Sequence, residues 1–130
     1  MNGNLSRAFT DQQEYELGRL VDRARESTGL TFSVFVGSTP DGGKPRAEAT
    51  RLLGEFGDEA PRVVLVYVDP NARALEIVTG SAAANLLDEH VCGFAAVTMT
   101  SSFALGDLPG GLQRGIEQLV GHITDFRPAS

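Results

Sequence analysis

Apolar residues recur at helical spacing near the start of the chain. Four of them fall at positions i, i+3, i+4 and i+7, which is typical of one buried face of a helix: Leu17, Leu20, Val21 and Ala24. Thr10 and Gln13 have the spacing of a capping box, and Gly29 suits the left-handed position that ends a helix. The pattern predicts a helix that begins at Thr10 and ends before Gly29.

Two runs of apolar residues then predict strands. Residues 30–36 alternate. Residues 62–69 contain six consecutive apolar positions rich in β-branched side chains, which indicates a central strand covered on both faces. Residues 69–72 (Asp-Pro-Asn-Ala) fit a type I turn. The run at 74–79 is therefore expected to return antiparallel, so that the sheet is mixed.

Helices are expected in the remaining segments. One begins at Pro45 and stops at Gly57, and a short one covers residues 80–88. A third is predicted by apolar residues at helical spacing: Cys92, Ala95, Ala96, Met99 and Phe103. Asp107 is the expected N-cap of the last helix. Glycines at 111 and 115 inside that helix require a packing reason, for which we expect close contact with the sheet or, alternatively, a dimer interface.

These elements predict an α/β fold, a three-layer α/β/α sandwich around a small mixed sheet of about three or four strands. The expected organisation is a flexible N-terminal arm (1–8), one domain (9–126) and a C-terminal tail (127–130). A chain of 130 residues can bury a core without metal or disulfide bonds.

The amino-acid composition excludes several classes of function for this chain. The net charge is −6 and Lys44 is the sole lysine, which argues against nucleic-acid binding. Cys92 is the sole cysteine, so an internal disulfide is excluded and a reducing, cytoplasmic location is expected. The sequence has neither an apolar run of about 18 residues nor the apolar region of a signal peptide, so no membrane segment is predicted.

Three segments of the chain carry a resemblance to a known family: 9–30, 62–80 with its Asp-Pro-Asn-Ala-Arg turn, and 99–116 with Phe-Ala-Leu-Gly-Asp. In these segments the chain resembles the TPM domain family, and more closely a small actinobacterial branch of it known as a domain of unknown function (DUF5130-like). The resemblance implies an α/β/α sandwich, and in some members phosphatase activity with divalent cations held by loop carboxylates. The family's glycine-x-glycine-leucine-glutamate segment is replaced here by Thr79-Gly80 followed by Ser-Ala-Ala-Ala.

Three aspartates at predicted element ends are the candidate metal ligands: Asp69, Asp88 and Asp107. Ca²⁺ or Mg²⁺ needs several oxygen ligands that converge from loops. Each aspartate also has a structural interpretation, because Asp69 begins a turn, Asp88 lies near a helix end and Asp107 is an N-cap.

A candidate anion site combines Gly80 and Ser81, at the start of a helix, with Arg73 on the neighbouring turn. A plain N-cap is the favoured interpretation of Ser81, because the full glycine-rich phosphate-binding motif is missing. His90 and Cys92 are too few to form a structural zinc site, and a buried core thiol is the favoured interpretation of Cys92.

Two functions remain open. The favoured one is a non-enzymatic accessory or protein-interaction domain, monomeric or weakly homodimeric, with an unidentified protein partner. The alternative is a divalent-cation-dependent phosphatase that uses the three aspartates, with the cation polarising a phosphoryl oxygen.

Overall fold

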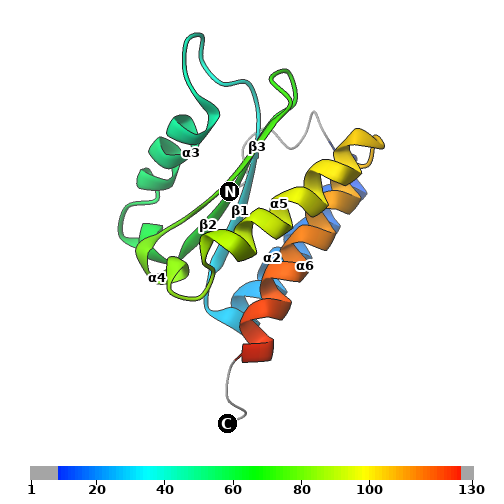
Figure 1. Cartoon of the computed structure of the whole chain (residues 1–130). Helices are drawn as coiled ribbons and strands as arrows, with labels where there is room; N and C mark the ends of the chain where they lie inside the picture. The colour runs from blue at the N-terminus through cyan, green and yellow to red at the C-terminus, as the bar shows by residue number, and fades with distance from the viewer. Residues whose placement is uncertain (1–8, 127–130) are drawn as a thin grey trace.

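The computed structural model describes residues 9–126, so the predicted arm (1–8) and tail (127–130) lie outside it. Its elements follow one another along the chain as Figure 1 shows. They are α2 (Asp11–Thr28), β1 (Thr31–Val36), α3 (Pro45–Gly54), the 3₁₀ helix η1 (Gly57–Arg62), β2 (Val63–Asp69), β3 (Ala74–Thr79), α4 (Ser81–Ala84), α5 (Glu89–Ala104) and α6 (Leu108–Phe126).

The sheet is mixed, as the sequence predicts. The strand order is β1-β2-β3, with β1 parallel to β2 and β3 antiparallel to β2. Every residue of β2 is buried, which fits the central position expected from its continuous apolar run. Within residues 9–126, β1 and β3 are the two edge strands, because β2 has a neighbour on each side.

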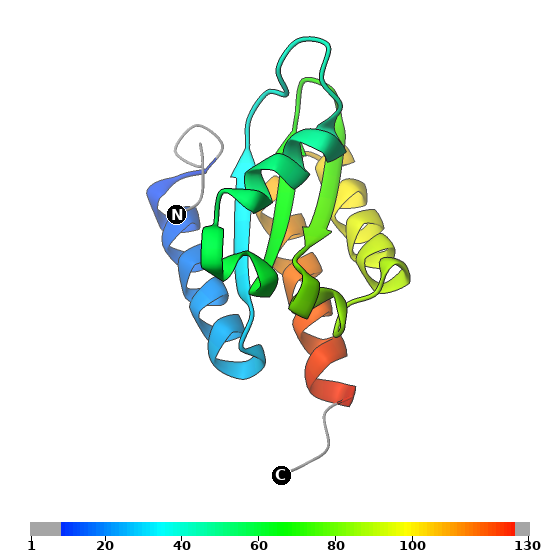
Figure 2. The same ribbon diagram turned by 90° about the vertical axis from the view of Figure 1, so that its left-hand side faces the viewer.

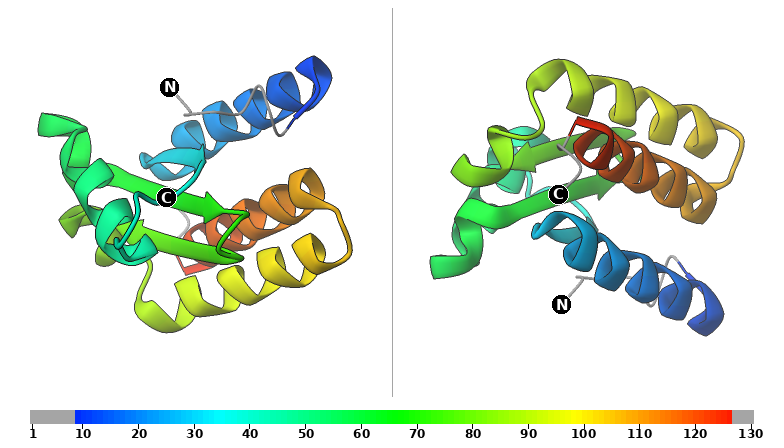
Figure 3. Two further views of the ribbon diagram at one scale, coloured as in Figure 1. Left: turned by 90° about the horizontal axis from the view of Figure 1, so that it is seen from above. Right: turned by 90° about the horizontal axis from the view of Figure 1, so that it is seen from below.

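Helices cover both faces of the sheet, so the three-layer sandwich is confirmed (Figure 3). On one face, α2, α5 and α6 enclose the larger core, which includes Phe32, Val34, Val66, Ile77, Met99 and Ile116. On the other face, α3 covers a smaller core of Ala49, Val63, Leu65, Tyr67 and Val78. Alternation along each strand sends neighbouring side chains into different cores.

The start and end of α2 confirm the capping prediction. The Thr10 hydroxyl accepts a hydrogen bond from the Gln13 amide at 3.1 Å, and the Gln13 side chain accepts one from the Thr10 amide at 2.9 Å. Gly29 adopts a left-handed conformation with φ of 78°, which is why glycine ends this helix.

Two helix boundaries differ from the prediction. The helix that starts at Pro45 ends at Gly54 and not at Gly57, and residues 57–62 form η1, for which the sequence made no prediction. Pro61 lies inside η1, and a proline ring prevents a regular α-helix from continuing there. The helix expected over 80–88 ends at Ala84, because Asp88 caps α5 and belongs to the start of that helix.

Gly111 and Gly115 let α6 pack closely against α5, not against the sheet as we expected. A Cβ atom at Gly111 would lie 2.7 Å from the Ser102 Cβ and 3.0 Å from the Met99 carbonyl oxygen. A Cβ at Gly115 would collide with the Met99 side chain. The small residues therefore serve a contact between two helices within the chain.

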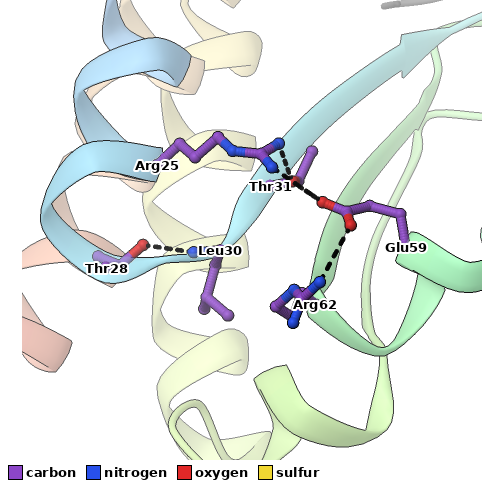
Figure 4. A network of polar contacts seen from close by, with 6 residues as sticks. All are labelled: Arg25, Thr28, Leu30, Thr31, Glu59 and Arg62. Atoms are coloured by element: carbon purple, nitrogen blue, oxygen red, sulfur yellow. Dashed lines mark hydrogen bonds and ion pairs between the residues drawn. The ribbon is translucent and has the colours of Figure 1, made fainter.

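A polar network joins the two helical layers at the start of β1 (Figure 4). Glu59 of η1 accepts a hydrogen bond from the Thr31 hydroxyl at 3.0 Å and forms ion pairs with Arg25 of α2 at 3.3 Å and with Arg62 at 3.4 Å. These contacts lower the pKa of Glu59, mainly through the hydrogen bonds from Thr31 and Arg62. The network links α2 and η1 across the first residue of an edge strand.

Candidate functional site

Asp69 ends β2, and its carboxylate is buried with only 3% of the residue exposed. One oxygen accepts a hydrogen bond from the Thr39 amide at 2.8 Å, and the other accepts one from the Ala72 amide at 3.1 Å. Burial raises the pKa of Asp69, but the hydrogen bonds from Thr39 and Ala72 outweigh burial and hold the pKa below its ordinary value. Asp69 is therefore a charged acceptor that organises its own turn.

The hydrogen bond from Thr39 to Asp69 joins the loop between β1 and α3 to the β2–β3 hairpin. The loop and the hairpin lie together at one end of the sheet (Figure 2). The Thr39 and Tyr67 hydroxyls are 2.8 Å apart, and the Asn71 side chain donates to the Ser38 hydroxyl at 3.0 Å. Polar residues from two separate loops thus form one hydrogen-bonded cluster around Asp69.

Asp88 and Asp107 are N-caps. The Asp88 carboxylate accepts a hydrogen bond from the Val91 amide at 3.0 Å, and the Asp107 carboxylate accepts one from the Gly110 amide at 2.9 Å. Asp107 also lies 3.4 Å from the Arg114 guanidinium. The role predicted for Asp107 as a helix cap is confirmed, and Asp88 has the same role.

The aspartates do not share one end of the molecule. β3 runs back from the Asp69 turn along the whole sheet, so Asp88, which follows α4, belongs to the opposite end. Within residues 9–126, no group of three or more His, Cys, Asp or Glu side chains is placed to hold a metal ion.

Gly80, Ser81 and Arg73 do not converge either. Arg73 precedes β3 and Gly80 follows it, so a strand of six residues, roughly 20 Å at the usual rise per residue, separates them. Gly80, and not Ser81, is the N-cap of α4. A Cβ at Gly80 would collide with the backbone of Ala60 and Pro61, so this glycine permits a close approach between α4 and η1.

Cys92 packs against the larger core, as expected of a core thiol, but it is only partly buried and not fully buried. Burial raises the pKa of Cys92, and the nearby Asp88 carboxylate raises it further. A thiol with a raised pKa is mostly protonated at neutral pH and is a poor nucleophile.

The outward face of α5 carries apolar residues that sequence reasoning missed. Phe94 is 67% exposed and Val97 is 62% exposed, and Leu105, just after the helix, is 87% exposed. The signal for this surface is a run from residue 91 to residue 106 without a charged side chain. We call Phe94, Val97 and Leu105 the α5 surface.

A groove of about 560 Å³ lies between β3, α3 and the first half of α5, and its walls include Arg46, Glu76, Ile77, Cys92 and Ala96. A second hollow of about 580 Å³ lies between the β2–β3 turn and the end of α5. Leu75 lines both, so the two hollows follow β3 from end to end. We call the first one the β3 groove.

Residues 2–119 match a family model described as Domain of unknown function (DUF5130). No curated protein matches the chain. None of the helices in residues 9–126 combines the length and apolar character that a bilayer crossing requires.

Three solved structures are similar in fold. The BA42 protein from the psychrophilic bacterium Bizionia argentinensis is 16% identical, with 94% of this chain and 86% of that chain covered and a TM-score of 0.81. The N-terminal domain of the cg2496 protein from Corynebacterium glutamicum is 16% identical, with 94% and 78% covered and a TM-score of 0.75. The N-terminal domain of a protein from P. gingivalis is 15% identical, with 90% and 77% covered and a TM-score of 0.79.

Proposed function

The chain belongs to the family described as Domain of unknown function (DUF5130), and we propose that it is a protein-interaction domain without catalytic activity of its own. The observation that carries the proposal is the α5 surface. Two large apolar side chains one turn apart, Phe94 and Val97, are mostly exposed on a helix whose outward face has no charge. Apolar patches of this kind on an acidic protein are typical of contact surfaces for other proteins.

The acidic residues support the interaction role over a cation-dependent phosphatase. A hard cation needs several carboxylate or carbonyl oxygens directed at one point. Asp69, Asp88 and Asp107 direct their oxygens at backbone amides of their own turns and helices. Titration with Ca²⁺ and Mg²⁺, followed by backbone amide NMR, is expected to give no saturable shift at these residues. Saturable shifts centred on them would contradict the proposal and favour the phosphatase.

Photo-cross-linking tests the α5 surface directly. A benzoylphenylalanine at position 97, installed in the cells that normally make the protein, is expected to give a discrete cross-linked species. Tyr15 of α2 is 61% exposed and provides the matched control position on another helix. Equal labelling from positions 15 and 97, or none from either, contradicts the proposal.

A distant relationship to the TPM domain family, through an actinobacterial branch, is part of the proposal. The mixed sheet and the Asp-Pro turn after its central strand support it. Intermediate sequences that connect the two families in steps of clear similarity would be the supporting result, and a gap without such intermediates would contradict it.

A further inference from the structure

β3 is an edge strand whose outer side is open. Its one strand neighbour in the described part of the chain is β2. The Gly80 amide donates to the Val63 carbonyl at 2.9 Å, and the register pairs Val64 with Thr79. Since hydrogen-bonded and non-bonded pairs alternate in an antiparallel ladder, residues 75, 77 and 79 direct their backbone N–H and C=O groups away from β2. These groups form a template for a further strand.

The β3 groove provides room along this edge. α3 forms one wall through Arg46, and α5 forms the other through Cys92, Gly93 and Ala96. Small side chains on the α5 wall leave space for the side chains of an added strand. Alternate residues of such a strand would face the apolar α5 wall and the polar α3 wall.

The other edge of the sheet is different. At β1, the Arg25–Glu59 ion pair links the helical layers across Thr31 (Figure 4). At β3, Arg46 of α3 pairs with Glu76 of the strand itself at 3.0 Å. No ion pair or side-chain hydrogen bond within residues 9–126 joins α3 to α5 across the β3 groove.

The charge of the β3 groove indicates what kind of strand fits. Glu76, Asp88 and Glu89 line it together with one basic residue, Arg46. Arg46 is already paired with Glu76. Asp88 and Glu89 therefore leave an excess of negative charge at the end of the groove where α5 begins, and a basic side chain would complement it.

We infer that the free edge of β3 binds an extended segment of a partner protein as an added strand, with apolar residues facing α5 and a lysine or arginine beside Asp88 and Glu89. This inference rests on the proposed interaction function and adds to it a binding mode and a partner chemistry. The backbone hydrogen bonds supply affinity and the alternating walls supply selectivity.

A display library of random 12-residue peptides, selected against the whole chain, tests the inference. Enriched peptides are expected to alternate apolar and polar residues and to carry a lysine or arginine. Added to the ¹⁵N-labelled protein, they should shift the amides of Leu75, Ile77 and Thr79. They should also slow alkylation of Cys92, which lines the groove.

Single substitutions separate the contributions of backbone hydrogen bonds and of charge to peptide binding. Thr79→Pro removes an N–H that points away from β2, and edge strands tolerate proline at such positions. It is expected to weaken peptide binding about tenfold, the equivalent of one net hydrogen bond. Glu89→Gln should weaken binding of basic peptides about threefold, as for an exposed ion pair. Glu26→Gln, the same change on exposed α2, should leave it unchanged.

Three results would overturn the inference: enrichment of acidic peptides, no enrichment at all, or binding that shifts α5-surface amides and tolerates Thr79→Pro. If Thr79→Pro fails to fold, the amide shifts and the protection of Cys92 in the unmodified chain still decide the question. Photo-cross-linking from position 97 tests the proposed function independently, because position 97 lies on the α5 surface and not at the edge of β3.

Discussion

At the scale of single residues, Asp69 connects two loops through one buried carboxylate. Replacing it with alanine removes the acceptor for the Thr39 and Ala72 amides. We expect Asp69→Ala to lower the free energy of unfolding by about 1–3 kcal/mol, the usual cost of leaving partly buried donors without an acceptor. Urea denaturation measures the loss. Asp22→Ala, on the exposed side of α2, is the control and should change stability little.

The stability that Asp69 contributes depends on pH, because its pKa is lowered in the folded state. A carboxyl group with a lower pKa in the folded state stabilises the fold above its unfolded pKa and loses this effect as the pH falls through its folded pKa. The ordinary value is 3.8, so the stabilisation is complete at neutral pH and declines below about that pH. The stability difference between the natural chain and Asp69→Ala should therefore shrink in acid. A constant difference from pH 7 to pH 2 would contradict the assignment.

Cys92 gives a second prediction at this scale. Burial and Asp88 raise its pKa, so little thiolate exists at pH 7. Alkylation by iodoacetamide at pH 7 should be at least several times slower than for a free cysteine, and should accelerate as the pH rises. The rate is measured by intact-protein mass spectrometry. Rapid reaction at pH 7, equal to that of cysteine in an unfolded chain, would contradict the burial of this thiol.

At the scale of elements, the contact between α5 and α6 depends on glycine. Gly111→Ala would add a methyl group 2.7 Å from the Ser102 Cβ, and we expect a net loss of about 1–3 kcal/mol from overpacking. At Gly121, in the same helix, an added Cβ would meet open space. Gly121→Ala should raise the free energy of unfolding by up to about 1 kcal/mol, because alanine has the higher helix propensity. Thermal unfolding compares the two, and a change of the same sign in both would contradict the packing contact.

Elements whose signals are local were predictable from the sequence. The capping box of α2, the apolar run of β2 and the hairpin that follows depend on neighbouring residues, and all three are present. η1 was missed because Gly57 and Pro61 are signals for turns and loops as well as for a 3₁₀ helix. The contact partner of Gly111 is set by helix packing, which a single sequence does not encode locally.

In the candidate site, too, the features with local sequence signals were predictable and those set by tertiary packing were not. The capping role of Asp107 follows from its position before a helix and was predictable. The separation of Arg73 from Gly80 was implied by the predicted hairpin, because a hairpin places its turn and its last residue at opposite ends of a strand. The α5 surface was missed because Cys92, Ala95 and Met99 account for the buried stripe, while the exposure of Phe94 depends on what lies outside the helix.

At the scale of the whole molecule, charge opposes self-association while the α5 surface favours it. Each chain carries a net charge of −6. The α5 surface consists of three side chains, whereas a stable interface takes about 20–30 residues from each partner. We expect a monomer at micromolar concentration. Salt screens the repulsion, so any dimer should become more abundant at high ionic strength, and Val97→Glu should reduce it. Sedimentation equilibrium measures both effects. A dimer that salt weakens would contradict this balance.

The packing of α2 against α6 has a consequence for synthesis of the protein. The first and last described helices share one core with the sheet. During translation the apolar face formed by Phe32, Val34 and Ile77 emerges from the ribosome well before α6. Until α6 arrives, this face lacks part of its cover, so we expect the nascent chain to expose apolar surface of the kind that ribosome-associated chaperones bind.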